Sequence, residues 1–161
     1  MANPGVIDYT HMDNQAGMDI IQNNQRVRAT PSNPLGVNYL DGIGTPISLN
    51  VSANQTLTAA QLLTGVITVK SSAAINVAFD TAANIVAAVN ANTAGAVVGD
   101  YISVLLVNGA SATGTLTLVT STGVTYDANQ ANSTIPVGTS RYVLIRLTNV
   151  TPGSEACVVY L

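Results

Sequence analysis

The sequence predicts a mainly β protein: an antiparallel β-sandwich of jelly-roll type, with one short inserted helix and an extended N-terminal arm. From residue 47 onward, short runs of β-branched and aliphatic residues recur between turns rich in Gly, Asn and Thr. Helical periodicity is sustained at one place, 82–90. Residues 1–46 hold four of the six prolines and show no sustained apolar period. The chain therefore divides into an arm, 1–46, and a sandwich domain, 47–161.

The composition predicts a protein that buries surface against other chains. Of 161 residues, 47% are hydrophobic and 8% are charged, whereas a soluble domain averages roughly 25% charged residues. So few charges give a lone monomer weak protection against association. We therefore expect copies of the chain, or a large partner, to cover part of its surface.

The first strand expected in the sandwich is 47–51, where apolar and polar residues alternate. Thr58 and Gln61 have the spacing of a capping box, and Gly65 is placed to end the turn, so 59–64 should be one short helix. Strands 66–70 and 75–79 follow.

Thr81 is the expected N-cap of the longer helix, because apolar residues recur at helical spacing after it. Two strands then follow, 100–109 and 115–120, and their short Gly-containing connector predicts a β-hairpin. The remaining strands are expected at 124–126, 142–148 and 156–161, the last two forming a hairpin around the turn at 151–154.

Several of these strands are apolar on both faces. A sandwich in a lone monomer should have one polar face on each strand, so we expect another subunit to cover the second face. The alternative is that the inserted helix covers it. The residues predicted to form a subunit interface are Tyr101, Leu105, Val107, Tyr142, Leu144, Arg146, Val159 and Leu161.

The arm is predicted to become ordered on a partner surface. Its polar composition is also that of a disordered tail, but a solvated tail would hold fewer apolar side chains than this one. The predicted docking residues are Tyr9, Met12, Met18, Ile20, Ile21, Arg26, Arg28 and Tyr39.

No catalytic set is recognisable in the sequence. The single histidine, His11, and the single cysteine, Cys157, lie at opposite ends of the chain, and Cys157 is expected to be a buried hydrophobic residue. Asp80 and Asp100 have the positions of cap and turn residues. A carboxylate pair drawn from Asp80, Asp100, Asp127 and Glu155 would support a small hydrolase, which we keep as an alternative.

We expect no cofactor, no metal, no nucleic acid and no membrane partner. The net charge is −3, and the five cations are scattered, whereas nucleic-acid binding needs clustered cations. His11, Asp13 and Asp19 include too few nitrogen or sulfur ligands for zinc. No run reaches the roughly 20 apolar residues of a membrane helix. Residues 1–30 lack the apolar segment of a signal peptide.

The sandwich domain resembles the β-rich domain of the capsid decoration (cement) and head-fibre proteins of tailed bacteriophages. The resemblance covers about residues 47–161, and the arm is not matched. The phrases that carry it are LTAAQLLTGVITV at 57–69, FDTAANIV at 79–86, VGDY at 98–101, TLTL at 115–118, YVLIRLTNV at 142–150 and SEA at 154–156.

The resemblance implies a non-enzymatic virion protein, made in the host cytoplasm. Its implied partners are its own copies, in a homotrimer, and the major capsid protein, whose shell it stabilises from the outer surface. The alternative is a head or tail fibre module that binds a host-surface glycan, for which exposed aromatics such as Tyr126 and Tyr142 should cluster at a loop end.

On the outward face of the last hairpin, Arg146 is expected to pair with Glu155.

Overall fold

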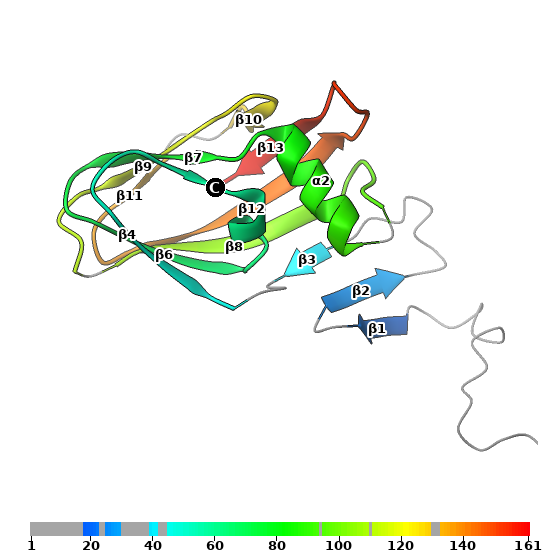
Figure 1. Ribbon diagram of the computed structural model, residues 1–161, viewed down its shortest axis with the longest axis horizontal. Helices are drawn as coiled ribbons and strands as arrows, with labels where there is room; N and C mark the ends of the chain where they lie inside the picture. Colours follow the sequence, from blue (N-terminus) through cyan, green and yellow to red (C-terminus); the bar gives the residue numbers. More distant parts are fainter. Residues whose placement is uncertain are drawn as a thin grey trace, which may run out of the picture.

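The computed structural model describes residues 18–22, 25–29, 39–41, 45–93, 95–109, 111–129 and 133–161. Within them the protein is mainly β, as predicted, with one sheet layered over part of another and two helices over the remainder (Figure 1). The turns that connect the two layers gather at one end of the molecule, and the helices lie toward the other end.

The larger sheet has seven strands in the order β10-β13-β12-β8-β6-β4, with β3 also pairing with β8. Its central strands, β8 and β12, are the longest of the described strands. The strands of this sheet are β3 (Tyr39–Asp41), β4 (Ile47–Val51), β6 (Val66–Ser71), β8 (Tyr101–Asn108), β10 (Val124–Tyr126), β12 (Ser140–Asn149) and β13 (Ala156–Tyr160).

The smaller sheet has four strands in the order β11-β9-β7-β5. These strands are β5 (Gln55–Leu57), β7 (Ile75–Phe79), β9 (Leu116–Val119) and β11 (Thr134–Ile135). Of these strands, β7 and β9 were predicted from the sequence, and β5 and β11, which have three and two residues, were not. Runs of two or three residues are too short to show the alternation of apolar and polar residues that identifies a strand.

The strands wind between the two sheets in β-arches, which are strand–turn–strand units whose strands lie in opposite sheets. Each of the strands β4, β6 and β8 crosses over to β5, β7 and β9 respectively. Successive arches stack in parallel, β4 on β6 on β8 in one sheet and β5 on β7 on β9 in the other. The helices provide the return crossovers that parallel neighbours require.

The predicted antiparallel pairing is therefore wrong for most of the fold. Within the described ranges six strand pairs are parallel and four are antiparallel. The predicted hairpin of 100–109 with 115–120 is also wrong, because β8 pairs with β6 and β12 while β9 pairs with β7 and β11. The predicted hairpin at the C-terminal end is confirmed as β12 and β13.

Both helices begin at the predicted caps. In α1 (Ala59–Leu62) the Thr58 hydroxyl accepts from the backbone N–H of Gln61, and the Gln61 side chain accepts from the N–H of Thr58. The Thr81 side chain caps α2 (Ala82–Asn92) by accepting from the N–H of Asn84. The helices contribute Leu62, Ile85 and Val89 to the same core that the two sheets bury. They therefore pack on the inner face of the larger sheet.

Part of the predicted arm belongs to the folded protein. A two-stranded antiparallel ribbon is formed by β1 (Met18–Gln22) and β2 (Gln25–Ala29). β3 pairs in parallel with the first residues of β8, and β2 lies beside β3. The boundary predicted at residue 46 therefore does not separate the larger sheet from the segment before it.

Backbone contacts between neighbouring turns set how closely the arches stack. The turn between β8 and β9 donates from Thr113 N–H to the Ser71 carbonyl at 2.8 Å, and Ile75 N–H donates to the Thr115 carbonyl at 3.2 Å. Gly114 lies against the turn between β6 and β7, where a Cβ atom would overlap the backbone carbonyl of Ala73. Only glycine fits at this position unless the two turns separate.

Gly114→Ala should therefore destabilise the protein by about 3 kcal/mol or more, because the overlapping atoms are backbone and cannot rotate away. The control is Gly138→Ala, at φ +73° with no atom within 4 Å of the added Cβ, which should cost about 1–2 kcal/mol from backbone strain alone. Urea unfolding of both variants measures the difference. Equal losses would show that the turns do not stack as described.

Candidate interaction surface

Alternation divides the central strands of the larger sheet into two faces. On β8, the inner residues Ile102, Val104 and Leu106 are at most 1% exposed. On β12, Val143 and Ile145 are fully buried opposite them. The residues between these positions point to the other face, which neither helix covers.

This outer face is mostly apolar in its centre. Side chains line up in rows across the strands: Val66, Leu105 and Tyr142 form one row, and the next holds Leu144, Tyr160 and the buried Ser103. Tyr142 is 51% exposed, and its apolar neighbours are half-buried. The outer-face patch consists of Val66, Tyr101, Leu105, Val107, Tyr142, Leu144, Val158 and Tyr160.

Polar groups border the outer-face patch. Arg146 lies between Tyr101 and Val158 in the row nearest the helices, and it is exposed. At the opposite end of the sheet, Lys70 is paired in register with Asn50, and both are exposed. An apolar centre with a polar rim is the usual anatomy of a protein–protein interface.

Six of the eight predicted interface residues lie on this face, namely Tyr101, Leu105, Val107, Tyr142, Leu144 and Arg146. The other two, Val159 and Leu161, are not part of it. Val159 is fully buried opposite Ile145, and Leu161 packs against the core.

Every residue of β13 is apolar or aromatic, so alternation in this strand does not show which residues face inward. The register with β12 decides it, and places Val158 and Tyr160 on the outer face in place of Val159. The same register puts Val158, and not Glu155, opposite Arg146. The Glu155 carboxylate instead accepts from Gly153 N–H at 2.9 Å, within the turn before β13.

The predicted docking residues of the arm fall in several places. Met18, Ile20 and Ile21 belong to β1, Arg26 and Arg28 to β2, and Tyr39 to β3. Tyr9 and Met12 lie outside the described residues, as do the candidate metal ligands His11 and Asp13. Tyr39 is in register with Tyr101 at the border of the outer-face patch.

Each candidate carboxylate serves a local turn or a helix start. Asp100 is buried and accepts from Val97 N–H at 2.9 Å. Asp127 accepts from the backbone N–H and the side-chain amide of Asn129. In the described part of the chain, no group of three or more His, Cys, Asp and Glu side chains is placed to hold a metal ion. The hydrogen bonds described for these carboxylates do not link any two of them into the carboxylate pair that a hydrolase needs.

Asp80 connects the starts of both helices. One carboxylate oxygen accepts from Ala59 N–H at 2.8 Å, in the first turn of α1. The other accepts from Thr81 N–H at 2.8 Å and from the Asn84 amide at 2.7 Å, at the start of α2. Burial alone would raise the pKa of Asp80, but the bonds from Asn84, Ala59 and Thr81 outweigh it and hold the pKa below 3.8.

Two further side chains are buried away from solvent. Among the described residues the Tyr126 hydroxyl has no hydrogen-bond partner, and burial raises the pKa of Tyr126 to about 12. Burial likewise raises the pKa of the Cys157 thiol to about 12, which leaves it a protonated core residue, as predicted, and a poor nucleophile at neutral pH.

Among the helices of the described residues, none has the length and apolar character to cross a membrane. Comparison with protein-family models, with curated proteins and with solved structures finds no match for this chain.

Asp80→Asn should lower the free energy of unfolding at pH 7 by about 1–2 kcal/mol, because the amide has one acceptor oxygen in place of two and lacks the charge that strengthens these hydrogen bonds. Because the folded-state pKa of Asp80 is below 3.8, its contribution is present above the unfolded-state pKa and is lost as pH falls through the folded-state pKa. The wild-type advantage should therefore shrink below about pH 4. Urea unfolding across pH measures it, with Asp127→Asn as the control. An advantage that persists undiminished at low pH would contradict the assignment.

Proposed function

We propose that this chain is a non-enzymatic structural protein of a virion, a capsid decoration protein. It binds the outer surface of the shell as a homotrimer and stabilises the shell through added contacts. The observation that carries the proposal is the outer-face patch, an apolar surface with a polar rim on the larger sheet, on the face opposite the helices. The resemblance of residues 47–161 to the decoration proteins supplies the biological setting.

The patch suits subunit association for two physical reasons. Aromatic and aliphatic side chains provide most of the free energy of binding in protein interfaces, and Tyr101, Tyr142 and Leu144 are of these types. The described residues of the sandwich also carry few charges, so little desolvation of charge opposes contact.

A trimer suits a non-enzymatic protein that stabilises a shell only by binding to it. Any protein that binds the assembled shell and not its dissociated subunits lowers the free energy of the shell by mass action. Three copies held together bind simultaneously, so that three weak contacts act as one strong contact. The major capsid protein is the shell partner in this proposal.

The fibre alternative required aromatics gathered at a loop end. Tyr126 instead lies in register with the buried Val159 and has a buried hydroxyl. Tyr142 lies within β12, on the outer face of the larger sheet and not at a loop end. The tyrosines therefore give no support to a stacking site for glycans.

Light scattering coupled to size exclusion should give a solution mass three times the 16.5 kDa of one chain. Leu144→Glu places a charge in the centre of the outer-face patch and should dissociate the trimer to monomers, since burying an unpaired carboxylate costs several kcal/mol. Ala87→Glu, on the exposed side of α2, adds the same charge and should leave the mass unchanged. A monomeric wild type, or a trimeric Leu144→Glu variant, would refute the interface.

The role on the shell is tested in the virus that encodes this chain. Virions lacking the protein should rupture at a lower temperature than complete virions, and adding the purified full chain should restore the rupture temperature. The Leu144→Glu variant should restore it less, because monovalent docking is weaker. Equal rupture temperatures with and without the protein would contradict the proposal, whatever the oligomeric state.

A further inference from the structure

The turns of the three stacked arches form a shallow depression at the end of the sandwich opposite the helices. Its volume is about 420 Å³, which lies within the usual range for small-ligand sites. Each arch contributes part of its wall. The lining residues are Asn50, Val51, Ser52, Lys70, Ser71, Ser72, Ser111 and Thr113.

Hydrogen bonds between the β6–β7 and β8–β9 arches hold two of these walls in place. Gly109 N–H donates to the Val69 carbonyl at 2.9 Å, and Thr113 N–H donates to the Ser71 carbonyl at 2.8 Å. The Thr113 hydroxyl donates to the Ser72 carbonyl at 2.7 Å. A site with walls fixed before binding loses less entropy when a ligand enters.

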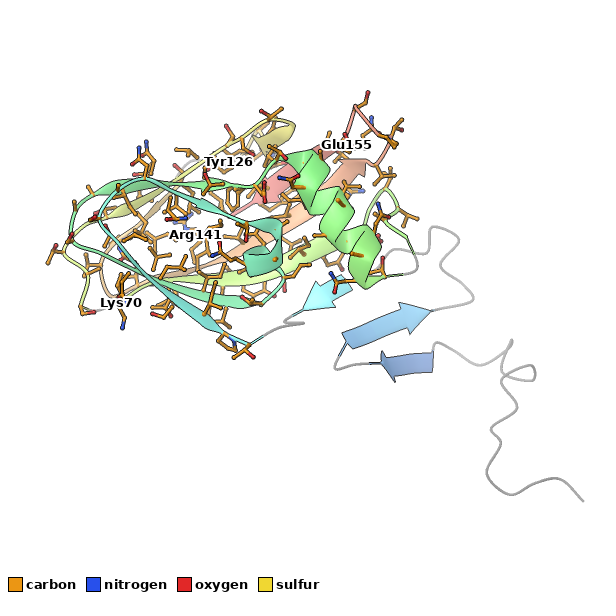
Figure 2. The ribbon with its side chains drawn as sticks, viewed as in Figure 1. Lys70, Tyr126, Arg141 and Glu155 are labelled. Carbon is orange, nitrogen blue, oxygen red and sulfur yellow. The ribbon has the colours of Figure 1, made fainter. Side chains whose placement is uncertain are left out.

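Lys70 is held by its methylene stem and leaves its charge available. The stem passes over Gly109, where an added Cβ would lie 2.8 Å from Lys70 Cγ. Figure 2 shows the side chain at the turn end of the sandwich, pointing away from the core. Within the described chain its ammonium has no hydrogen bond or ion pair, and no carboxylate lines the depression.

The neutral polar groups around Lys70 are also available. Among the described residues, the Asn50 amide and the hydroxyls of Ser52, Ser72 and Ser111 take part in no hydrogen bond of the structure. Hydroxyls and amides both donate and accept, so together they match a ligand that carries several hydroxyl groups. Val51 and the Lys70 stem give the apolar contact that the carbon skeleton of such a ligand needs.

We propose that this depression binds an acidic saccharide. The sugar carboxylate accepts from the Lys70 ammonium, and the ring hydroxyls bond to Asn50 and to the serines. A phosphate group would be matched less well, because it calls for several cationic donors or a cradle of backbone N–H groups, and one ammonium is present. The site adds a binding activity to the proposed decoration function, and binding by a single chain does not depend on the trimer.

Ligand-observed saturation-transfer NMR on the full chain tests the proposal, with D-galacturonate as the probe and D-galactose as the matched neutral sugar. Galacturonate should give saturation transfer, and galactose should give much less. Lys70→Met removes the ammonium and keeps the stem, so it should weaken galacturonate binding by about tenfold or more. Lys70→Arg keeps a positive charge at the same position, outside the outer-face patch, and should retain most of the galacturonate binding.

Several results would overturn the proposal. These are no transfer to galacturonate in the wild type, equal transfer to galactose, unchanged binding in Lys70→Met, or displacement by inorganic phosphate at an equal concentration. The Leu144→Glu variant, if monomeric, should still bind galacturonate with the same affinity for each chain. Failure of the trimer and failure of the saccharide site are therefore observed separately.

Discussion

The arch turns stack closely on one another, and this stacking sets the strand registers of both sheets. Gly114 allows the β8–β9 turn to lie against the backbone at Ala73, and Thr113 N–H then bonds to the Ser71 carbonyl. This contact fixes the register of β6 with β8 and of β7 with β9. A slip of one residue would exchange the inner and outer faces of a strand, so the composition of the outer-face patch follows from the turn geometry.

Local chemistry in the sequence predicted the elements well but their pairing poorly. Alternation located 66–70, 75–79 and 142–148, and the capping threonines located both helix starts. Pairing is a long-range property: the connector after β8 has the glycines of a hairpin loop, yet its seven residues carry the chain between layers. The residues of the outer-face patch could be predicted in β8 and β12, where the sequence pattern indicates which residues face inward. They could not be predicted in β13, whose residues are apolar throughout.

The proposed function follows from how the protein distributes its few polar and charged groups. Asp80, Asp100 and Asp127 are engaged in caps and turns, and Cys157 lies in the core. What remains for interaction is a face of tyrosines and aliphatic side chains, bordered by Arg146 at one end and Lys70 at the other. Such a surface suits association, and the arch-turn depression beside Lys70 suits a small polar ligand.

Hydroxyl-radical footprinting tests most directly whether the outer-face patch is where subunits meet. Tyr142 and Val98 are 51% and 49% exposed in the single chain, one in the patch and the other in the segment between α2 and β8. The oxidation rate of each residue is compared with its own rate in dilute, dissociated protein. Tyr142 should become protected as the chains associate, while Val98 should not. Association that leaves Tyr142 as reactive as in the dilute chain would contradict this expectation.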